Sequence, residues 1–153
     1  MNWLEHRIPP PVIALVSVAI AWALTRLTPA LTFQLSHRLE LAIAVALIGF
    51  SLDIWALLHF RRARTTFSPT TPQKSSALVQ GGPYRFTRNP MYLGLAIQLI
   101  AVSLYLGNPL ALIGLGFFLA WITRFQIRPE ERVMAEKFGE AYRSYRKRVR
   151  RWL

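Results

Sequence analysis

The 153-residue chain contains no cysteine, which excludes disulfide bonds, thiolate metal ligands and a cysteine nucleophile. It is also poor in acidic residues, with 7 Asp and Glu against 19 Lys and Arg, and charged residues make up only 17% of it. Soluble domains typically carry about 25% charged residues. No G-x-G-x-x-G sequence follows a strand pattern, so the signature of a Rossmann nucleotide site is missing. The three histidines are too scattered to build a metal site.

What the chain has instead is 53% hydrophobic residues, gathered into four apolar segments at about 11–27, 41–60, 91–106 and 110–127. A helix needs about 20 residues to span a bilayer, and these segments approach or meet that length. Gly107, Asn108 and Pro109 separate the last two segments without a charge, which is typical of a tight turn in a helical hairpin. We therefore predict an all-α integral membrane protein with about four transmembrane helices, forming a single domain over residues 1–153.

The basic residues predict the orientation of these spans. The connection 61–90 and the tail 128–153 carry most of the Lys and Arg, whereas the turn between the last two segments carries none. Because cytoplasmic loops are enriched in these residues, we expect the loop and the tail to be cytoplasmic. With four spans, the N-terminus is then cytoplasmic too, and we expect the membrane to be a bacterial inner membrane. No small-residue cleavage site follows segment 11–27, which favours a span over a cleaved signal peptide.

The tail has the pattern of an amphipathic helix. Its apolar and aromatic residues recur every three or four positions, at Met134, Phe138, Tyr142, Tyr145, Val149 and Trp152. We expect the rings to face the membrane and the basic groups to face anionic lipid phosphates, with Gly139 breaking the helix in two. The alternative is a soluble helix packed on the cytoplasmic loop. No nucleic-acid-binding module accompanies the basic run, so we expect no nucleic-acid partner.

A polar, turn-rich stretch at 81–94 leads directly into the third apolar segment. Polar groups at a membrane entry cost free energy unless they line a cavity or bind a ligand, so we predict a site here. Beyond the hairpin, Glu130 and Glu131 follow Pro129 at the predicted start of the tail helix, where acids also complement the helix dipole. Together with Arg88 on the same membrane face, these acids are expected to clamp an amino-acid zwitterion.

Two motifs of the chain resemble the isoprenylcysteine carboxyl methyltransferase family, which is related to the phospholipid methyltransferases. The resemblance covers roughly residues 41–153. The first motif comprises Leu78, Val79, Gly82, Pro83, Tyr84, Arg88, Asn89, Pro90, Tyr92 and Gly94. The second comprises Glu130 and Glu131, followed by Phe138, Gly139, Tyr142 and Tyr145.

The resemblance implies an integral membrane enzyme that binds S-adenosylmethionine in a cytoplasmic pocket built by the last two helices and the segments beside them. It implies that the first five residues of the first motif form part of the cofactor wall and that the other five form the turn that closes on the cofactor. It also implies that Glu130 and Glu131 hold the cofactor's ammonium. We expect Arg88 and Glu131 to be the catalytic residues. Many family members have histidine where this chain has Asn89. Because asparagine does not titrate near neutral pH, we expect no general base at this position.

Four further polar side chains are candidates for binding the methyl acceptor: Asp53, His59, Gln98 and Arg124. Each has a structural alternative. Asp53 and Gln98 could form hydrogen bonds between helices, His59 could be an ordinary interfacial histidine, and Arg124 could snorkel to the interface. The acceptor is expected to be lipophilic, with a prenylcysteine-like carboxylate, a phospholipid amine and a thiol as alternatives. The competing function is a small four-helix transporter or scaffold that uses Asp53 as its coupling acid.

Overall fold

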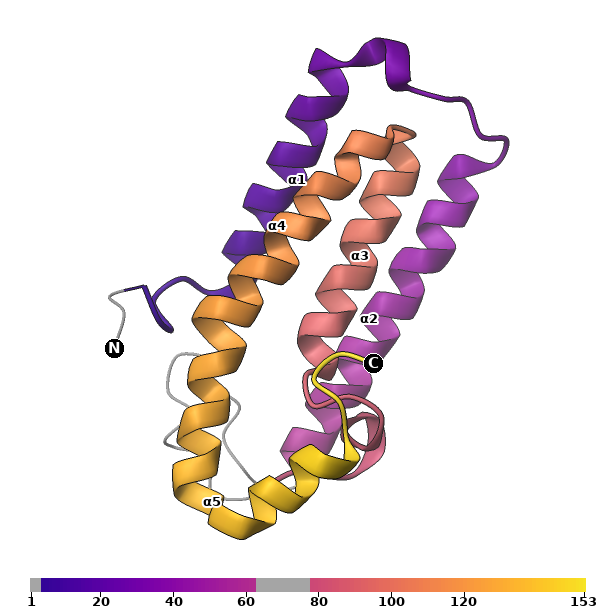
Figure 1. Cartoon of the computed structure of the whole chain (residues 1–153). Helices are drawn as coiled ribbons and strands as arrows, with labels where there is room; N and C mark the ends of the chain where they lie inside the picture. Colours follow the sequence, from indigo (N-terminus) through magenta and orange to yellow (C-terminus); the bar gives the residue numbers. More distant parts are fainter. Residues whose placement is uncertain (1–3, 63–77) are drawn as a thin grey trace.

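The computed structural model describes residues 4–62 and 78–153, so the part of the predicted loop at 63–77 lies outside the described residues. The main helices are α1 (Pro10–Leu27), α2 (Arg38–Arg62), α3 (Pro90–Leu106), α4 (Leu112–Ile122) and α5 (Arg128–Arg148). Figure 1 shows α1 to α4 side by side in a long bundle, with α5 bending across one end. No strand occurs in the described part of the chain. This confirms the all-α prediction.

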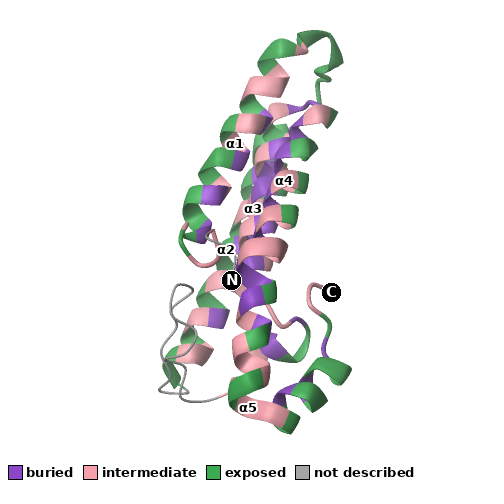
Figure 2. Cartoon of the chain, turned by 60° about the vertical axis from the view of Figure 1, so that its left-hand side comes forward, coloured by how far each residue is buried: buried purple, intermediate pink, exposed green. Residues whose placement is uncertain are grey.

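Three of the described helices are long and apolar enough to cross a membrane, namely α1, α2 and the continuous helix 109–148. The fourth apolar helix, α3, has 17 residues. Figure 2 shows that buried residues concentrate along α3 and α4, while the outer faces of α1 and α2 are largely exposed. Because many of these exposed side chains are large and apolar, the surface is suited to contact with lipid.

The helix boundaries follow from proline and glycine. Helices α1 and α3 begin at Pro10 and Pro90, where the missing N–H of proline costs no hydrogen bond. Helix α3 ends at Gly107, whose φ of 62° lies in the left-handed region. The side chain of Asn108 then accepts a hydrogen bond from the N–H of Leu110 at 2.9 Å. The predicted hairpin between the last two apolar segments is therefore confirmed.

The fourth span does not end before the tail helix. Helix α4 continues through a π-helical turn, Thr123–Ile127, directly into α5. Pro129 has no N–H to donate to the carbonyl of Phe125, and the backbone N–H of His6 donates to that carbonyl instead, at 3.2 Å. The prediction that Pro129, Glu130 and Glu131 lie in the first turn of the tail helix is confirmed, but this helix continues α4 without a break. The contact from the N-terminal segment thus occupies a carbonyl that the proline leaves without a helical donor.

The helices approach closely where glycine faces another helix. A Cβ atom on Gly114 of α4 would lie 2.4 Å from the carbonyl oxygen of Ser17 in α1. A Cβ atom on Gly49 of α2 would lie 2.7 Å from the carbonyl oxygen of Gly94 in α3. Small residues at such crossings let backbones pack tightly in a membrane, where burial from water supplies no driving force.

Helix α5 bends at Gly139, which has φ 50° and ψ −122°, as the sequence predicted. Beyond the bend, Tyr142 and Tyr145 are buried and pack with the partly buried Leu78. The hydroxyl of Tyr145 donates to the carbonyl oxygen of Tyr84 at 2.7 Å. The expectation that these rings face the membrane is therefore wrong, because they face the protein's own segment 78–90. This is the packing that the alternative described.

Candidate active site

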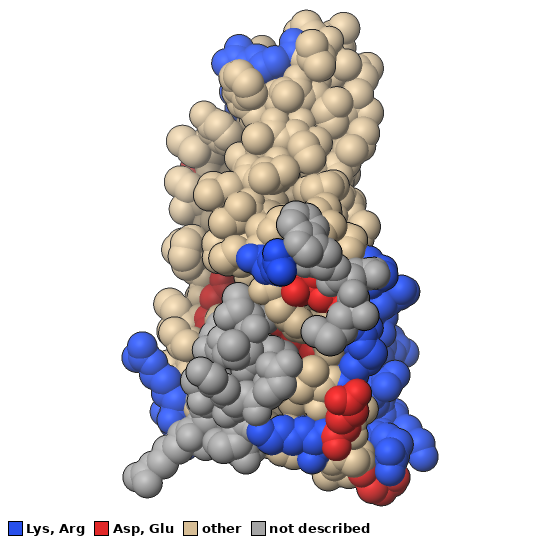
Figure 3. Space-filling model, turned by 90° about the vertical axis from the view of Figure 1, so that its left-hand side faces the viewer, with Lys and Arg blue, Asp and Glu red and all other residues tan. Residues whose placement is uncertain are grey.

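A cavity of about 110 Å³ lies at the end of the bundle where α2, α3 and α5 meet the segment 78–90. Figure 3 shows Lys and Arg side chains gathered at this end, with Asp and Glu between them, below a wide surface that is free of charge. Nine of the twelve predicted cofactor-binding residues line the cavity: Leu78, Val79, Tyr84, Arg88, Asn89, Pro90, Tyr92, Glu130 and Glu131. The fold thus brings together two motifs that are about 40 residues apart in the sequence.

Three other predicted residues, Gly82, Pro83 and Gly94, shape the surroundings of the cavity and do not line it. Gly82 has φ 57°, and a Cβ atom there would lie 2.3 Å from Nε2 of His59. A Cβ atom on Gly94 would lie 1.9 Å from Oδ1 of Asp53. Both glycines therefore make room for a polar side chain of α2, which lets α2 pack against the site.

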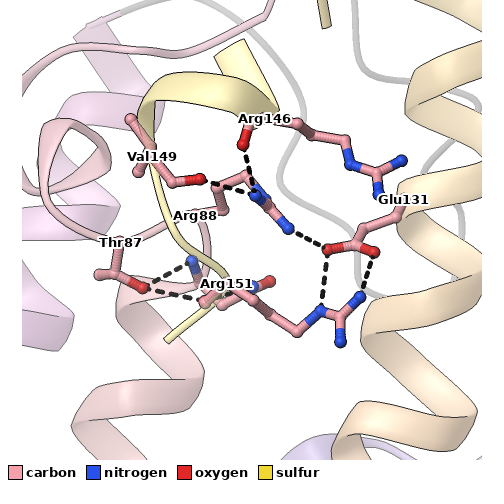
Figure 4. Close-up of polar contacts among 7 residues, drawn as sticks. Thr87, Arg88, Glu131, Arg146, Val149 and Arg151 are labelled. Carbon is pink, nitrogen blue, oxygen red and sulfur yellow. Dashed lines mark hydrogen bonds and ion pairs between the residues drawn. The ribbon is translucent and has the colours of Figure 1, made fainter. Parts of the chain in front are cut away.

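Glu131 is held by two guanidinium groups. Its Oε1 accepts from Nη2 of Arg88 at 2.6 Å, and Arg151 donates to both carboxylate oxygens, at 3.0 and 2.7 Å (Figure 4). The side chains of Arg88 and Glu131 are only 9% and 10% exposed. Burial alone raises the pKa of Glu131, but the hydrogen bonds from Arg151 and Arg88 outweigh burial and hold that pKa below its usual value. Glu131 is therefore a saturated, ionised carboxylate.

Glu130 has a different environment although it is the next residue. Its Oε1 accepts a hydrogen bond from the hydroxyl of Tyr92 at 2.5 Å, and no arginine pairs with it among the described ion pairs. Burial, with a smaller contribution from the charge of Glu131, raises the pKa of Glu130 to about 8, although the Tyr92 hydrogen bond acts the other way. Of the two carboxylates in the cavity, Glu130 is thus the one available to a ligand cation.

The predicted acceptor-binding residues do not line this cavity. Nε2 of Gln98 donates to Oδ2 of Asp53 at 2.8 Å, which links α3 to α2 as the structural alternative describes. Arg124 forms an ion pair with Glu5 at 3.4 Å, and Nδ1 of His59 lies 3.1 Å from a backbone carbonyl of its own helix. Their roles in binding an acceptor stay predictions.

The sequence reasoning missed several residues of the site. Phe60, Met91, Ile127, Met134, Tyr142 and Tyr145 also line the cavity. The sequence did mark the two tyrosines, because they belong to the second motif, but their spacing alone suggested a membrane-facing surface. Nothing in the sequence marked Arg151 as a site residue, since it is one of many cations in a basic tail and its partner Glu131 is 20 residues earlier.

A bundle of apolar helices is the architecture of an integral membrane protein, and in this one a cavity lined by charged side chains lies at one end. The phospholipid methyltransferase family matches residues 37–141 of the chain. The chain belongs to this family. The match extends from the start of α2 past the bend in α5, so it includes the first motif and both glutamates of the second. It favours the methyltransferase prediction over the transporter alternative.

Individual relatives agree with this assignment. An uncharacterized protein of Haemophilus influenzae is 49% identical over 63 residues, which are 41% of this chain and all of that protein. Protein-S-isoprenylcysteine O-methyltransferases of Dictyostelium discoideum and Saccharomyces cerevisiae are 32% and 35% identical over 72 and 80 residues. These matches cover 47% and 52% of this chain but only 30% and 34% of the two enzymes. The chain thus matches about a third of the length of these enzymes.

Proposed function

We propose that the chain is an S-adenosylmethionine-dependent methyltransferase that acts at the cytoplasmic face of a membrane on a lipophilic acceptor. The observation that carries this proposal is the cavity, in which the carboxyl group of Glu130 and the guanidinium of Arg88 lie among aromatic rings at the end of the apolar helices. Family membership supports methyl transfer as the reaction class.

The residues present fit the amino-acid end of S-adenosylmethionine. Its ammonium suits the Glu130 carboxylate, and its carboxylate suits Arg88, whose buried Nε has no hydrogen-bond partner within the described residues. The faces of Tyr84 and Tyr92 suit a sulfonium cation. The sulfonium supplies a methyl carbon that an acceptor can attack directly. The sequence predicted that Glu130 and Glu131 share the ammonium. We now propose that Glu130 alone binds it, because Glu131 is already paired with two arginines.

The protein's contribution to the reaction is then alignment and exclusion of water. In-line displacement at a methyl group needs the acceptor atom and the leaving sulfur on opposite sides of the carbon, and holding reactants in this geometry supplies much of the rate. The aromatic residues that line the cavity, including Tyr142 and Tyr145, exclude water from it. Asn89 donates its amide N–H to a backbone carbonyl at 2.9 Å, so it supports the site's backbone instead of removing a proton.

The acceptor is proposed to reach the cavity from the membrane, because the helices that bring the cavity residues together are also the apolar ones. A carboxylate or a thiolate acceptor arrives ionised and needs no base. An amine acceptor has to lose a proton, and Glu130 is engaged by the donor in this proposal. An ionised acceptor therefore makes the smaller demand on the residues present.

Isothermal titration of the detergent-purified protein with S-adenosylmethionine tests the proposal. We expect saturable binding that the Glu130→Gln variant weakens, and the absence of binding by a folded wild-type protein would refute the proposal. Incubating the protein with methyl-labelled donor and with fractionated membrane lipids or prenylcysteine then identifies the acceptor class. The Lys137→Gln variant, which removes a charge from α5 outside the cavity, serves as the matched control.

A further inference from the structure

The last residues of the chain form an extended strap across the first motif. Helix α5 ends at Arg148, and Val149 adopts extended φ and ψ of −122° and 129°. From there the chain lies beside residues 87–89, with an isolated β-bridge between Thr87 and Arg150. The N–H of Arg88 donates to the carbonyl of Arg150 at 3.0 Å. The contact thus joins the end of the chain to the turn that leads into α3.

Side chains of the first motif reinforce this contact. The hydroxyl of Thr87 donates to the carbonyl of Arg151 at 3.1 Å, and the amide of Asn89 donates to the same carbonyl at 2.9 Å. Nη1 of Arg88 donates to the carbonyl of Val149 at 2.6 Å. Figure 4 shows Thr87 and Arg88 of one segment meeting Val149 and Arg151 of the other. Residues at one wall of the cavity are therefore positioned by carbonyl groups of the chain end.

The side chain of Arg151 makes the most specific contact of the strap. Its guanidinium binds both oxygens of Glu131 in a fork, at 3.0 and 2.7 Å, while Glu131 also binds Arg88. A bidentate pair fixes orientation as well as position. Trp152 then packs against the apolar core cluster, and the neighbouring Val149 is buried. The strap is thus anchored on both sides of Arg151.

This arrangement separates the roles of two adjacent carboxylates. Without Arg151, Glu131 would keep a single arginine partner and could compete with Glu130 for a ligand cation or draw Arg88 away from a ligand anion. With Arg151 in place, Glu131 is saturated and Glu130 is left open to the cavity.

We infer that residues 149–153 support one wall of the methyl-donor cavity and that Arg151 is a positioning residue, which holds Glu131 so that Glu130 stays open to the donor ammonium and Arg88 keeps its Nε for the donor carboxylate. The identity of the donor rests on the proposed function. The contacts of the strap are independent of the proposed function, and they can be tested without any ligand.

The ligand-independent test is a double-mutant cycle. The Arg151→Gln and Glu131→Gln variants and their combination are compared with the wild type by thermal unfolding in detergent, followed by tryptophan fluorescence. Because the two side chains form one ion pair, we expect the double variant to lose clearly less than the sum of the two single losses. Additive losses would show that the contact does not form, and would overturn the inference.

The ligand-dependent test separates positioning from stability. We expect Arg151→Gln to weaken S-adenosylmethionine binding about ten- to a hundredfold, and Arg151→Lys to recover part of the loss. Lys147→Gln removes an exposed charge from the last turn of α5 and is expected to bind like the wild type. A lowered unfolding temperature with unchanged donor affinity would overturn the positioning role. If the wild type itself binds no donor, the proposed function fails, and the cycle alone decides whether the strap exists.

Discussion

The two ends of the bundle use arginine in opposite ways. At the cavity end, Arg88 and Arg151 converge on the buried Glu131 from segments far apart in the sequence. At the other end, Arg26 and Arg38 are exposed and lie over the rings of a tryptophan and a tyrosine, at 5.5 and 5.8 Å from the ring centres. Guanidinium groups over aromatic rings are typical anchors at a membrane interface. The comparison shows that basic residues define a site only where the fold provides them with buried partners.

The largest effect is expected from breaking the cavity-end ion pairs. Glu131→Gln leaves two guanidinium groups without their shared carboxylate, and loss of one partner from a buried pair costs about 3–5 kcal/mol. We expect a marked fall in the unfolding temperature of the detergent-purified protein. Because the pKa of Glu131 is lowered in the fold, its stabilisation is present above the ordinary pKa of a glutamate and is lost as the pH falls through the lowered value.

The control for this prediction is Glu140→Gln, which removes the exposed partner of Arg143 from the same helix. Exposed pairs contribute little, so we expect no measurable change in unfolding temperature. Equal losses in the two variants would contradict the distinction between buried and exposed pairs.

The second largest effect is expected on donor binding, and it distinguishes the role of Glu130 from that of Glu131. Glu130→Gln keeps the shape of the side chain and removes its charge, so donor binding is expected to weaken about ten- to a hundredfold while the protein stays folded. Calorimetric titration and thermal unfolding of the same preparation measure the two quantities. A variant that loses its fold but binds donor normally when folded would reverse the roles assigned to these two carboxylates.

A pH dependence sharpens the same contrast. The pKa of Glu130 is raised to about 8, so its carboxyl group is mostly protonated at pH 6 and ionised above pH 8. A cationic donor group prefers the ionised form, and we expect donor affinity to rise as the pH increases from 6 to 8. The linked stability has the opposite sign, because a raised carboxyl pKa favours the fold at low pH and the benefit is lost as the pH rises through 8. The Glu130→Gln variant should lose this rise in affinity.

A smaller effect is expected where α2 and α3 cross. A Cβ atom on Gly94 would lie 2.9 Å from the carbonyl oxygen of Gly49 and closer still to Asp53, so Gly94→Ala should destabilise the protein by about 1–3 kcal/mol. A Cβ atom on Gly116 would meet nothing within 4 Å, and Gly116→Ala should be neutral or stabilising by up to about 1 kcal/mol. Thermal unfolding measures the stability of the two variants, and similar losses of stability in both would argue against close packing at this crossing.

The smallest effect is expected at the end opposite the cavity. Arg26→Gln and Arg38→Gln remove exposed cations whose ring contacts contribute about 0.5–1 kcal/mol each. We expect unchanged donor affinity and a slight fall in unfolding temperature. Loss of donor binding in either variant would show that the two ends of the bundle are coupled.

Much of the fold could be predicted from the sequence because membrane helices leave strong local signals. Apolar segments at 11–27 and 41–60 became α1 and α2 with small changes in their ends, and Gly107 with Pro109 marked the hairpin. Turn chemistry and hydrophobic length act over a few residues, so a linear sequence displays them. The continuity of the helix through Pro129 was not predictable, because it combines a π-helical turn with a carbonyl group that binds the distant N–H of His6.

The helical membrane class, the hairpin, the bend at Gly139 and the two motifs could be read from residue order, because these depend on local backbone preferences and recognisable residue patterns. Three features required the folded chain: which of two adjacent glutamates has no arginine partner among the described ion pairs, which cation of a basic tail binds Glu131, and that the tail's tyrosines face the cavity. Those features depend on partners between 20 and 61 residues apart along the chain. Electrostatic and hydrogen-bond energies depend on distance and burial in space, which residue order alone does not specify.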